Sequence, residues 1–568
     1  MSTAPARPSL RARWLGRVSY DDALALQTAL WGGDQQYLLL CEHPPVYTMG
    51  VRTDPANILA DDLTALGAEV HRVTRGGDVT WHGPGQLVGY PLVSAPTRRG
   101  GGMADTVAYV RSVEQLLIDA LGDLGVRAGR RDRCPGVWMG DDTSGLRKVA
   151  AVGVRLRRGR AMHGFALNID PDLSWFDAIV PCGIADADVT SLAAEGSTAS
   201  MREVVDAIVD RAAELWGSGE PDRADVVWRH RPDDLSAFSR GAADERPSAG
   251  TDPGGIGAEG SLRLHGRLAE AGVAESFPVR TRKPEWLRRP VEASPGARAV
   301  GAAISELDLV TVCQEAGCPN QSECWSDGTA TFMINGERCT RACGFCLVDT
   351  RRPQPPDADE PARVAAAVQR MGLSFAVITT VARDDLPDGG AGQFAATIQA
   401  IRERSPEVGI EVLISDCQGE GEALRSIFDA APDVLNHNIE TVARLQRAAR
   451  PSASYARSLA VLARSKAAGL TTKSGLIVGM GESDDEIRRT LDDLAAVGVD
   501  IVTIGQYLRP TRSHLPVATW WKPEAFDRWK RYGEHTAGIG HVESSPLTRS
   551  SYHAKQAAAS TPAEGTRA

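Results

Sequence analysis

The chain of 568 residues lacks several features that would mark other classes of protein. It has no run approaching the roughly 18 consecutive apolar residues of a membrane-spanning helix, and its N-terminal segment has no apolar core typical of a signal peptide. It also lacks a basic excess, because 63 Lys and Arg residues stand against 73 Asp and Glu residues, for a net charge of -10. Nucleic-acid-binding proteins normally show such an excess. We therefore expect a cytoplasmic protein with no nucleic-acid partner and no membrane partner.

Large apolar residues are nearly missing from residues 241–260, which are rich in Gly, Ala, Ser and Pro. This composition is typical of a flexible linker, because it cannot bury enough apolar surface to fold. A chain of this length is also too long for one hydrophobic core. We expect a first domain over 1–218, a linker over 219–275 that is flexible at 241–260, and a second domain over 276–568 that ends in a disordered tail.

Six cysteines form two groups of three, and each group has one ligand fewer than a four-coordinate metal site needs. The first triad is Cys313, Cys318 and Cys324, and the second triad is Cys339, Cys343 and Cys346. In a reducing cytosol, clustered cysteines indicate metal ligands or nucleophiles rather than disulfides. A structural zinc site is usually closed by four protein ligands, whereas an iron-sulfur cubane held by three thiolates leaves one iron open. An open iron can bind a substrate or a cofactor.

The C-x3-C-x2-C spacing of the second triad, followed by repeating strand and helix patterns, resembles the radical S-adenosylmethionine enzymes. Together the two triads resemble one family among them, lipoyl synthase, over residues 281–555. The motifs that carry this resemblance include RKPEWLRRP at 282–290, RDDLPDGGA at 383–391, NHNIET at 436–441, TKSGLIVGMGE at 472–482 and RSSYHA at 549–554. Five strand-like runs with helical stretches between them also predict a parallel β/α barrel. The resemblance implies a partial (β/α)6 radical S-adenosylmethionine barrel.

The same resemblance implies the cofactors and the chemistry of the second domain. The second triad would hold a 4Fe-4S cluster that binds S-adenosylmethionine. A radical formed from this cofactor would remove hydrogen at C6 and C8 of an octanoyl chain. The first triad would hold an auxiliary 4Fe-4S cluster that supplies sulfur, with Ser551 as its fourth ligand and Ser550 as the alternative. A ferredoxin- or flavodoxin-type electron donor is also implied.

Two segments dominate the first domain, RGGDVTWHGPGQLVGYP at 75–91 and HGFALNIDPDLSWFDAIVPCGI at 163–184. The glycines of the first segment allow backbone amides to approach a ligand, although such loops also form ordinary turns. The second contains Cys182 in a Pro-Cys-Gly turn, and an isolated cysteine is more often a small buried side chain. Residues 148–156 alternate like a β-strand and place Lys148 on the apolar face, where desolvation would lower its pKa and let it accept a thiol proton. The alternative is a strand-end lysine that extends into water.

Over residues 10–216 these segments resemble the lipoyl(octanoyl) transferases. The resemblance implies a mixed-sheet α+β fold of the biotin and lipoate protein ligase type, with Cys182 as the acyl-thioester nucleophile and Lys148 as the base that lowers its pKa. The implied acyl-binding residues are Arg75, Gly76, Gly77, Asp78, Val79, Thr80, Trp81, His82, Ala151, Val152, Gly153, Gly164, Phe165 and Ala166. His82 and His163 are candidates for either a helping or a structural role.

Together the two resemblances imply one bifunctional enzyme of protein lipoylation. Its first domain would transfer octanoyl from octanoyl-acyl carrier protein to a lysine of a lipoyl carrier domain, and its second would insert sulfur at C6 and C8. The carriers would be those of the 2-oxoacid dehydrogenase complexes and the glycine cleavage H protein. Two alternatives stay open from the sequence: only one half is active, or the chain is a non-catalytic iron-sulfur module.

Overall fold

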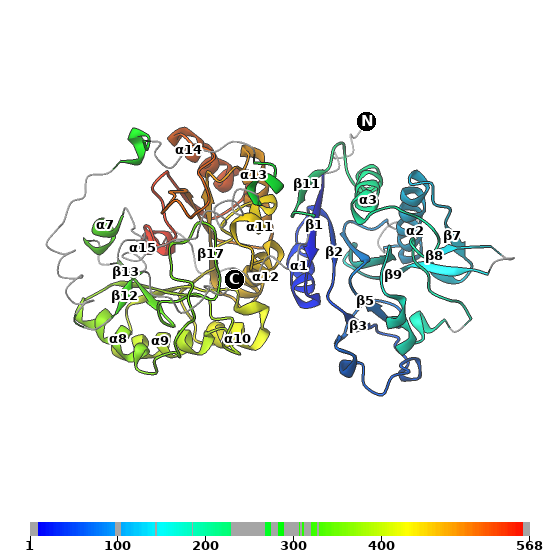
Figure 1. Cartoon of the computed structure of the whole chain (residues 1–568), viewed down its shortest axis with the longest axis horizontal. Coiled ribbons are helices and arrows are strands. Elements are labelled where there is room, and N and C mark those ends of the chain that lie inside the picture. The colour runs from blue at the N-terminus through cyan, green and yellow to red at the C-terminus, as the bar shows by residue number, and fades with distance from the viewer. Residues whose placement is uncertain are drawn as a thin grey trace. The chain divides into compact units, whose positions relative to one another are not determined.

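The computed structural model describes residues 9–96, 104–141, 145–184, 186–228, 267–273, 282–288, 306, 309–311, 320–326 and 329–559. The chain divides into two compact units, Met1–Trp228 and Arg229–Ala568, which are described separately below (Figure 1). The segment 241–260, predicted to be flexible, and the last nine residues of the predicted tail lie outside the described residues. Within the described ranges, no helix is both long and apolar enough to span a membrane.

The first unit is built on a mixed eight-stranded sheet. Across the sheet the order is β11 (Asp222–Asp225), β1 (Leu10–Arg17), β2 (Gln36–Glu42), β6 (Gln86–Leu92), β10 (Arg160–Asn168), β9 (Arg147–Arg157), β8 (Cys134–Met139) and β7 (Gly129–Arg131). β1 runs parallel to β2 and β11, whereas the pairs from β2 to β7 are antiparallel. A second sheet has the order β4 (Glu69–Arg72), β3 (Val46–Met49) and β5 (Val79–His82).

Among the described residues of this unit, the α-helices that cover the sheet are α1 (Tyr20–Trp31), α2 (Thr106–Asp123) and α3 (Met201–Trp216). Helices α2 and α3 contact each other, and α2 presents Val113, Leu117 and Leu121 to the core at the spacing of one helix face. This α+β arrangement confirms the fold predicted for the first domain.

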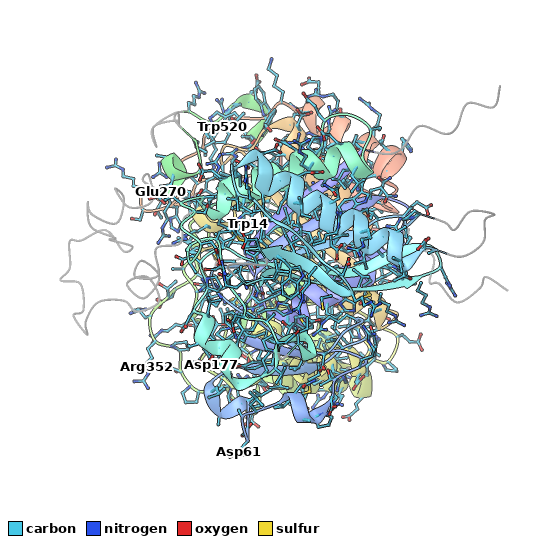
Figure 2. All side chains as sticks on the ribbon, turned by 90° about the vertical axis from the view of Figure 1, so that its right-hand side faces the viewer. Trp14, Asp61, Asp177, Glu270, Arg352 and Trp520 are labelled. Atoms are coloured by element: carbon cyan, nitrogen blue, oxygen red, sulfur yellow. The ribbon has the colours of Figure 1, made fainter. Side chains whose placement is uncertain are left out.

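The first unit extends beyond residue 218, where the sequence placed the start of the linker. Strand β11 pairs with β1, and the ring of Trp228 stacks on that of Trp14, which is labelled in Figure 2, with centroids 4.4 Å apart. At the other end of the predicted linker, Leu268 and Ala271 are buried, and Arg444 of the second unit donates a hydrogen bond to the Ala271 carbonyl. Both ends of the predicted linker therefore belong to folded units.

The second unit contains a mainly parallel sheet. Its order is β12 (Val310–Thr311), β13 (Thr329–Ile334), β14 (Phe375–Thr380), β15 (Gly409–Leu413), β16 (Val434–Asn436), β17 (Thr471–Val478), β18 (Ile501–Gln506) and β19 (His541–Ser544). All neighbouring pairs are parallel except β12 with β13.

A helix follows each of the six strands from β13 to β18. These helices are α8 (Glu360–Arg370), α9 (Ala391–Arg404), α10 (Gly421–Asp429), α12 (Tyr455–Ala467), α13 (Asp484–Ala496) and α14 (Pro523–Tyr532), and the shorter helices are α7 (Gln321–Ser326), α11 (Gln446–Ala449) and α15 (Ala554–Ala559). Figure 1 shows α8, α9 and α10 side by side along the strands. The six strand–helix units confirm the predicted (β/α)6 architecture.

A buried ion pair joins three neighbouring strands of this sheet. Lys473 on β17 donates to both carboxylate oxygens of Glu411 on β15, at 2.9 and 3.0 Å, and Asn436 on β16 donates to the same carboxylate at 3.0 Å. All three side chains are fully buried. Because an unpaired buried charge is strongly destabilising, this contact favours one register of the three strands.

Candidate functional site

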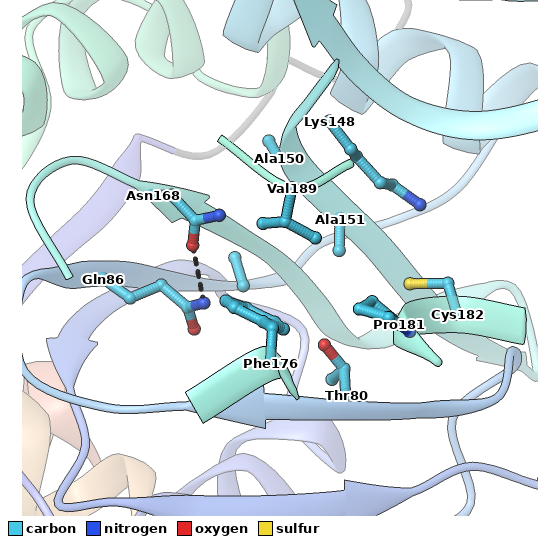
Figure 3. Close-up of a pocket in the computed structure, with 11 residues that line it drawn as sticks. Thr80, Gln86, Lys148, Ala150, Ala151, Asn168, Phe176, Pro181, Cys182 and Val189 are labelled. Atoms are coloured by element: carbon cyan, nitrogen blue, oxygen red, sulfur yellow. Dashed lines mark hydrogen bonds between the residues drawn. The ribbon is translucent and has the colours of Figure 1, made fainter. Parts of the chain in front are cut away.

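Lys148 and Cys182 reach the same pocket of the first unit. Lys148 comes from β9, and Cys182 comes from the turn Pro181–Gly183. The pocket has a volume of about 270 Å³, open solvent at its mouth included, and is lined by Thr80, Gln86, Lys148, Ala150, Ala151, Ala166, Asn168, Phe176, Pro181, Cys182 and Val189. Figure 3 shows the amine of Lys148 and the sulfur of Cys182 on the same side of this pocket. A potential base and a potential nucleophile thus meet beside a mainly apolar surface.

The backbone of Cys182 is in the left-handed region, with φ 58° and ψ 17°. Non-glycine residues seldom adopt this conformation, and it persists where the surroundings hold it. The turn is held by the Val180 N–H, which donates to the Asn57 carbonyl at 2.8 Å, and by the Asn57 side chain, which donates to Asp78 at 2.5 Å. Gly183 has φ 68°, and a Cβ atom on it would lie only 2.8 Å from the Asp78 carboxylate, so a larger residue there would strain the turn and displace Asp78. These contacts fix the direction of the Cys182 side chain.

Lys148 is almost buried, with 7% of its surface exposed. Its backbone N–H donates to the Asp188 carbonyl at 2.8 Å, and its carbonyl accepts from the Thr190 N–H at 2.9 Å. Its ammonium lies 5.4 Å from the ring centroid of Trp138, a distance at which the ring face attracts a cation. The predicted strand around Lys148 is confirmed as β9, and Lys148 points into the pocket instead of into water.

The three segments predicted to bind the acyl group lie together. In the β9–β10 pair, Gly153 is opposite Gly164 and Ala151 is opposite Ala166. A Cβ atom on Gly153 would lie 3.1 Å from the Arg75 side chain, and one on Gly164 would lie 2.0 Å from the Gly89 carbonyl oxygen, so both positions are tightly packed. From these segments, the residues that line the pocket are Thr80, Ala151 and Ala166. The other predicted residues are not among those that line it.

Arg75 is a buried cation close to the Cys182 turn. Its guanidinium donates to the carbonyls of Asp78 at 2.7 Å and Thr48 at 2.6 Å. Burial lowers the pKa of Arg75, while a negative charge on Cys182 would raise it.

The two candidate histidines are also buried. Burial lowers the pKa of His82 to about 3 and that of His163 to about 4, so both rings are neutral at pH 7. Neither ring lines the pocket, but His82 contacts Gln86, with Nδ1 at 2.7 Å from Oε1. Through this contact His82 holds the side chain of Gln86, which lines the pocket.

Six of the pocket residues were not predicted from the sequence. Gln86 donates to Asn168 at 2.8 Å, and Figure 3 shows this bonded pair across the pocket from Lys148 and Cys182. Asn168 could have been found, because it lies two residues beyond Ala166 on one strand and therefore on the same face. The missed residues are Gln86, Ala150, Asn168, Phe176, Pro181 and Val189.

The second triad lies in one loop that follows β13 of the second unit. The Cys346 N–H donates to the Cys343 carbonyl at 3.1 Å, and Cys339 Sγ accepts from the N–H groups of Arg341 at 3.4 Å and Ala382 at 3.3 Å. Burial raises the pKa of the Cys343 thiol to about 11 and that of Cys346 to about 12. Iron binding would replace these protons, since the thiolate is the ligand form. Three thiols in one loop, with two peptide donors to the Cys339 sulfur, fit a three-thiolate cluster site.

Arg341 fastens this loop to the ends of two strands. Its guanidinium donates to Asp384, which follows β14, at 2.7 and 2.8 Å, and to Asp416, which follows β15, at 2.6 Å. The Asp416 side chain is fully buried. The carboxyl ends of parallel strands are where β/α barrels place their sites. The loop thus lies at the catalytic end of the barrel.

In the described part of the chain, no three His, Cys, Asp or Glu side chains are arranged to hold one metal ion. A cubane cluster does not require such an arrangement, because each thiolate binds a different iron atom.

The first triad is only partly described. Cys324 lies in α7, whereas Cys313 and Cys318 fall outside the described residues. Two contacts join the region of α7 to the segment that carries the predicted serine ligand: Tyr552 donates to Glu323 at 3.0 Å, and Asn320 donates to the Leu547 carbonyl at 2.7 Å.

The two serine candidates differ in their surroundings. Ser550 Oγ accepts a hydrogen bond from Asn438 at 2.8 Å. Within the described ranges, Ser551 Oγ makes no hydrogen bond. Ser550 is thus engaged by Asn438, and the assignment of Ser551 as the fourth ligand stays a prediction.

Comparison with known proteins matches both units to families. Residues 17–213 match the lipoyl protein ligase A/B catalytic domain, and residues 333–494 match the radical SAM superfamily. The lipoyl synthase of Rubrobacter xylanophilus is 55% identical over 276 residues, which cover 48% of this chain and 86% of that protein. The lipoyl synthase of Mycobacterium leprae is 49% identical over 293 residues, covering 52% of this chain and 91% of that protein.

Among solved structures, a bipartite lipoate protein ligase from Thermoplasma acidophilum aligns over 38% of this chain and 88% of its own, with 18% identity and a TM-score of 0.33. We draw no conclusion from a score that low. The family match and the identity to lipoyl synthases are sufficient by themselves. The chain therefore belongs to the lipoyl synthase family, and it joins a radical SAM domain to an N-terminal lipoyl protein ligase A/B catalytic domain.

Proposed function

We propose that this protein assembles the lipoyl group on a carrier domain in two steps, one in each unit. The first unit transfers octanoyl from octanoyl-acyl carrier protein to a carrier lysine through a thioester on Cys182. The second unit inserts two sulfur atoms at C6 and C8 of the bound octanoyl chain. The observation that carries the proposal is the meeting of Lys148 and Cys182 in one mainly apolar pocket.

The transfer step needs two protein groups, the Lys148 amine and the Cys182 thiol. Lys148 takes the proton of Cys182, and the thiolate attacks the octanoyl thioester, so that a new C–S bond forms as the carrier thiolate leaves. Lys148 returns its proton to that leaving group. The ammonium of the target lysine then loses one proton through Lys148 to solvent, attacks the Cys182 thioester, and restores the thiol with its second proton as the amide forms.

The second unit supplies the ligands for sulfur insertion. The second triad would hold a 4Fe-4S cluster, and the first triad with Ser551 would hold an auxiliary 4Fe-4S cluster as the sulfur source. When bound, the cluster of the second triad, together with S-adenosylmethionine, supplies a radical that can remove hydrogen from an unactivated methylene. The task of Arg341 is to hold the cysteine loop at the strand ends through its two carboxylate partners.

The partners follow from the two steps. An acyl carrier protein delivers octanoyl, and lipoyl carrier domains of 2-oxoacid dehydrogenase complexes and glycine cleavage H protein accept it. A ferredoxin- or flavodoxin-type protein supplies electrons to the second unit.

The test is anaerobic reconstitution with iron and sulfide, followed by mass spectrometry of an apo carrier domain given octanoyl donor, reductant and S-adenosylmethionine. We expect a mass gain of one octanoyl group and then of two sulfur atoms. A Cys182→Ser chain should give neither product from octanoyl-acyl carrier protein, yet should still convert a carrier that is already octanoylated. Absence of any octanoyl adduct on wild-type Cys182 would overturn the first half, and failure to convert the preloaded carrier would overturn the second.

A further inference from the structure

Gly136 on β8 lies directly against the side chain of Lys148. A Cβ atom at residue 136 would lie 2.6 Å from Lys148 Cε and 2.5 Å from the Ala150 carbonyl oxygen, both closer than real Cβ contacts. The backbone at Gly136 also has φ 132°, which L side chains rarely adopt. The missing side chain at this position therefore provides the space that the end of Lys148 occupies.

The pairing of β8 with β9 is irregular at the same place. Val137 pairs with Ala150 and Trp138 pairs with Lys148, so β9 has one residue more than β8 between the two pairs. A bulge of this kind redirects the side chains beside it. The Trp138 indole, whose N–H donates to the Cys134 carbonyl at 3.0 Å, then presents its ring to the Lys148 ammonium.

A buried carboxylate on α2 holds Gly136 from the other side. Glu114 is 1% exposed, and its Oε1 accepts the Gly136 N–H at 2.9 Å. Its Oε2 accepts from Arg111 at 3.0 Å and from Arg130 at 3.1 Å. The two arginines pair its charge, so Glu114 can act as a fixed anchor for the backbone of β8.

We propose that Glu114 and Gly136 are positioning residues for acyl transfer. Glu114 fixes the backbone of Gly136, and Gly136 leaves the space through which Lys148 reaches Cys182. Neither residue lines the pocket, so both act through Lys148. This inference rests on the proposed role of Lys148, and the experiment below separates the two.

The test uses the full-length chain with Gly136→Ala, Glu114→Ala, Lys148→Ala and the double variants that combine Lys148→Ala with each of the first two. Gly125→Ala is the matched control, because Gly125 also has a positive φ, of 74°, but no atom lies within 4 Å of its would-be Cβ. Two rates are measured across pH: octanoyl-enzyme formation on Cys182 by mass spectrometry, and alkylation of the Cys182 thiol by iodoacetamide.

We expect Lys148→Ala and Gly136→Ala each to slow octanoyl-enzyme formation by on the order of 100-fold and to move the alkylation profile to higher pH. Glu114→Ala should act in the same direction with a loss of roughly tenfold. In the Lys148→Ala background, Gly136→Ala and Glu114→Ala should cause no further loss, since residues that act through one group are not additive. Gly125→Ala should match the wild type in both rates.

The outcomes separate the two proposals. If Lys148→Ala slows the reaction while Gly136→Ala and Glu114→Ala do not, the positioning inference is wrong and the role of Lys148 stands. Full additivity in the double variants would also overturn the inference. If Lys148→Ala changes neither rate, the proposed role of Lys148 itself is wrong. Should Gly136→Ala fail to fold, Glu114→Ala alone and with Lys148→Ala carries the same test.

Discussion

Cys182, the proposed nucleophile, has a backbone conformation that favours glycine. In this region an L residue is strained by roughly 1–2 kcal/mol, and glycine is not. Glycine loses more conformational entropy on folding, which offsets part of this advantage. We therefore expect Cys182→Gly to be more stable than Cys182→Ala by about 1 kcal/mol. Peptide-resolved hydrogen exchange of the turn in the full-length chain measures this difference.

The matched comparison is Cys41, which is fully buried in β2 and has an ordinary strand backbone. There the order should reverse, with Cys41→Gly less stable than Cys41→Ala, because glycine weakens a strand interior. If the glycine variant were also the less stable one at residue 182, Cys182 would store no backbone strain.

Buried histidines give the first unit an acid-sensitive stability. Burial lowers the pKa of His43 from 6.5 to about 4, and its ring contacts the Val18 carbonyl and the Tyr90 hydroxyl, both at 2.7 Å. The unfolded chain binds a proton near pH 6.5 and the folded chain does not, so this stability is present above pH 6.5 and is lost as the pH falls toward 4. His82 and His163 shift in the same direction.

We expect hydrogen exchange in β2 and β6, corrected for the intrinsic rate, to show greater opening at about pH 5 than at about pH 7.5. Protection that stayed constant or increased on acidification would contradict the lowered pKa values.

At the scale of elements, regular patterns could be predicted from the sequence and long-range pairing could not. The alternation of residues 148–156 predicted β9. It placed Lys148 on the face of Val152 and Val154, which pack in the core, whereas Lys148 lines the pocket beside Ala151. The bulge opposite Trp138 could not be predicted, because it depends on how β8 pairs with β9. Strand β11 was also missed, since its sequence DRAD has no apolar alternation and becomes a strand only beside β1. Phe176 enters the pocket from the short 3-10 helix Leu173–Ala178, and Val189 enters it from a segment outside the helices and strands. The path of neither segment is revealed by a periodic pattern in the sequence.

The link between the cysteine loop and the strand ends makes a separate prediction. Asp416→Asn removes one of the two charges that pair with Arg341 in a buried site, and breaking such a pair costs roughly 3 kcal/mol. We expect faster hydrogen exchange of the loop around Cys339 and a lower iron content after anaerobic reconstitution.

Asp357→Asn is the control, because Asp357 pairs with Arg363 at 2.7 Å on the surface and solvent screens that pair. It should leave loop exchange and iron content at wild-type values. Equal effects of the two substitutions would show that the bridge to Arg341 does not hold the loop.

At the scale of the whole molecule, each unit has a hydrophobic core of its own. We therefore expect the two activities to fail separately: Cys182→Ser should abolish octanoyl transfer and leave S-adenosylmethionine cleavage intact, and Cys343→Ala should do the reverse. Acyl-enzyme mass and 5'-deoxyadenosine release measure the two activities. Loss of both from one substitution in a folded chain would show that the sites depend on each other.

The ion pair between Lys473 and Glu411 limits which amino-acid substitutions the barrel interior can accept. Replacing either partner alone leaves the other as an unpaired charge in the buried interior. Replacing both by apolar residues of similar size is often tolerated. Stepwise mutation would therefore have to pass through a poorly folded intermediate to reach a well-folded double variant. Directed evolution of this barrel should vary the two positions together, because libraries of single changes will discard that solution at the first round.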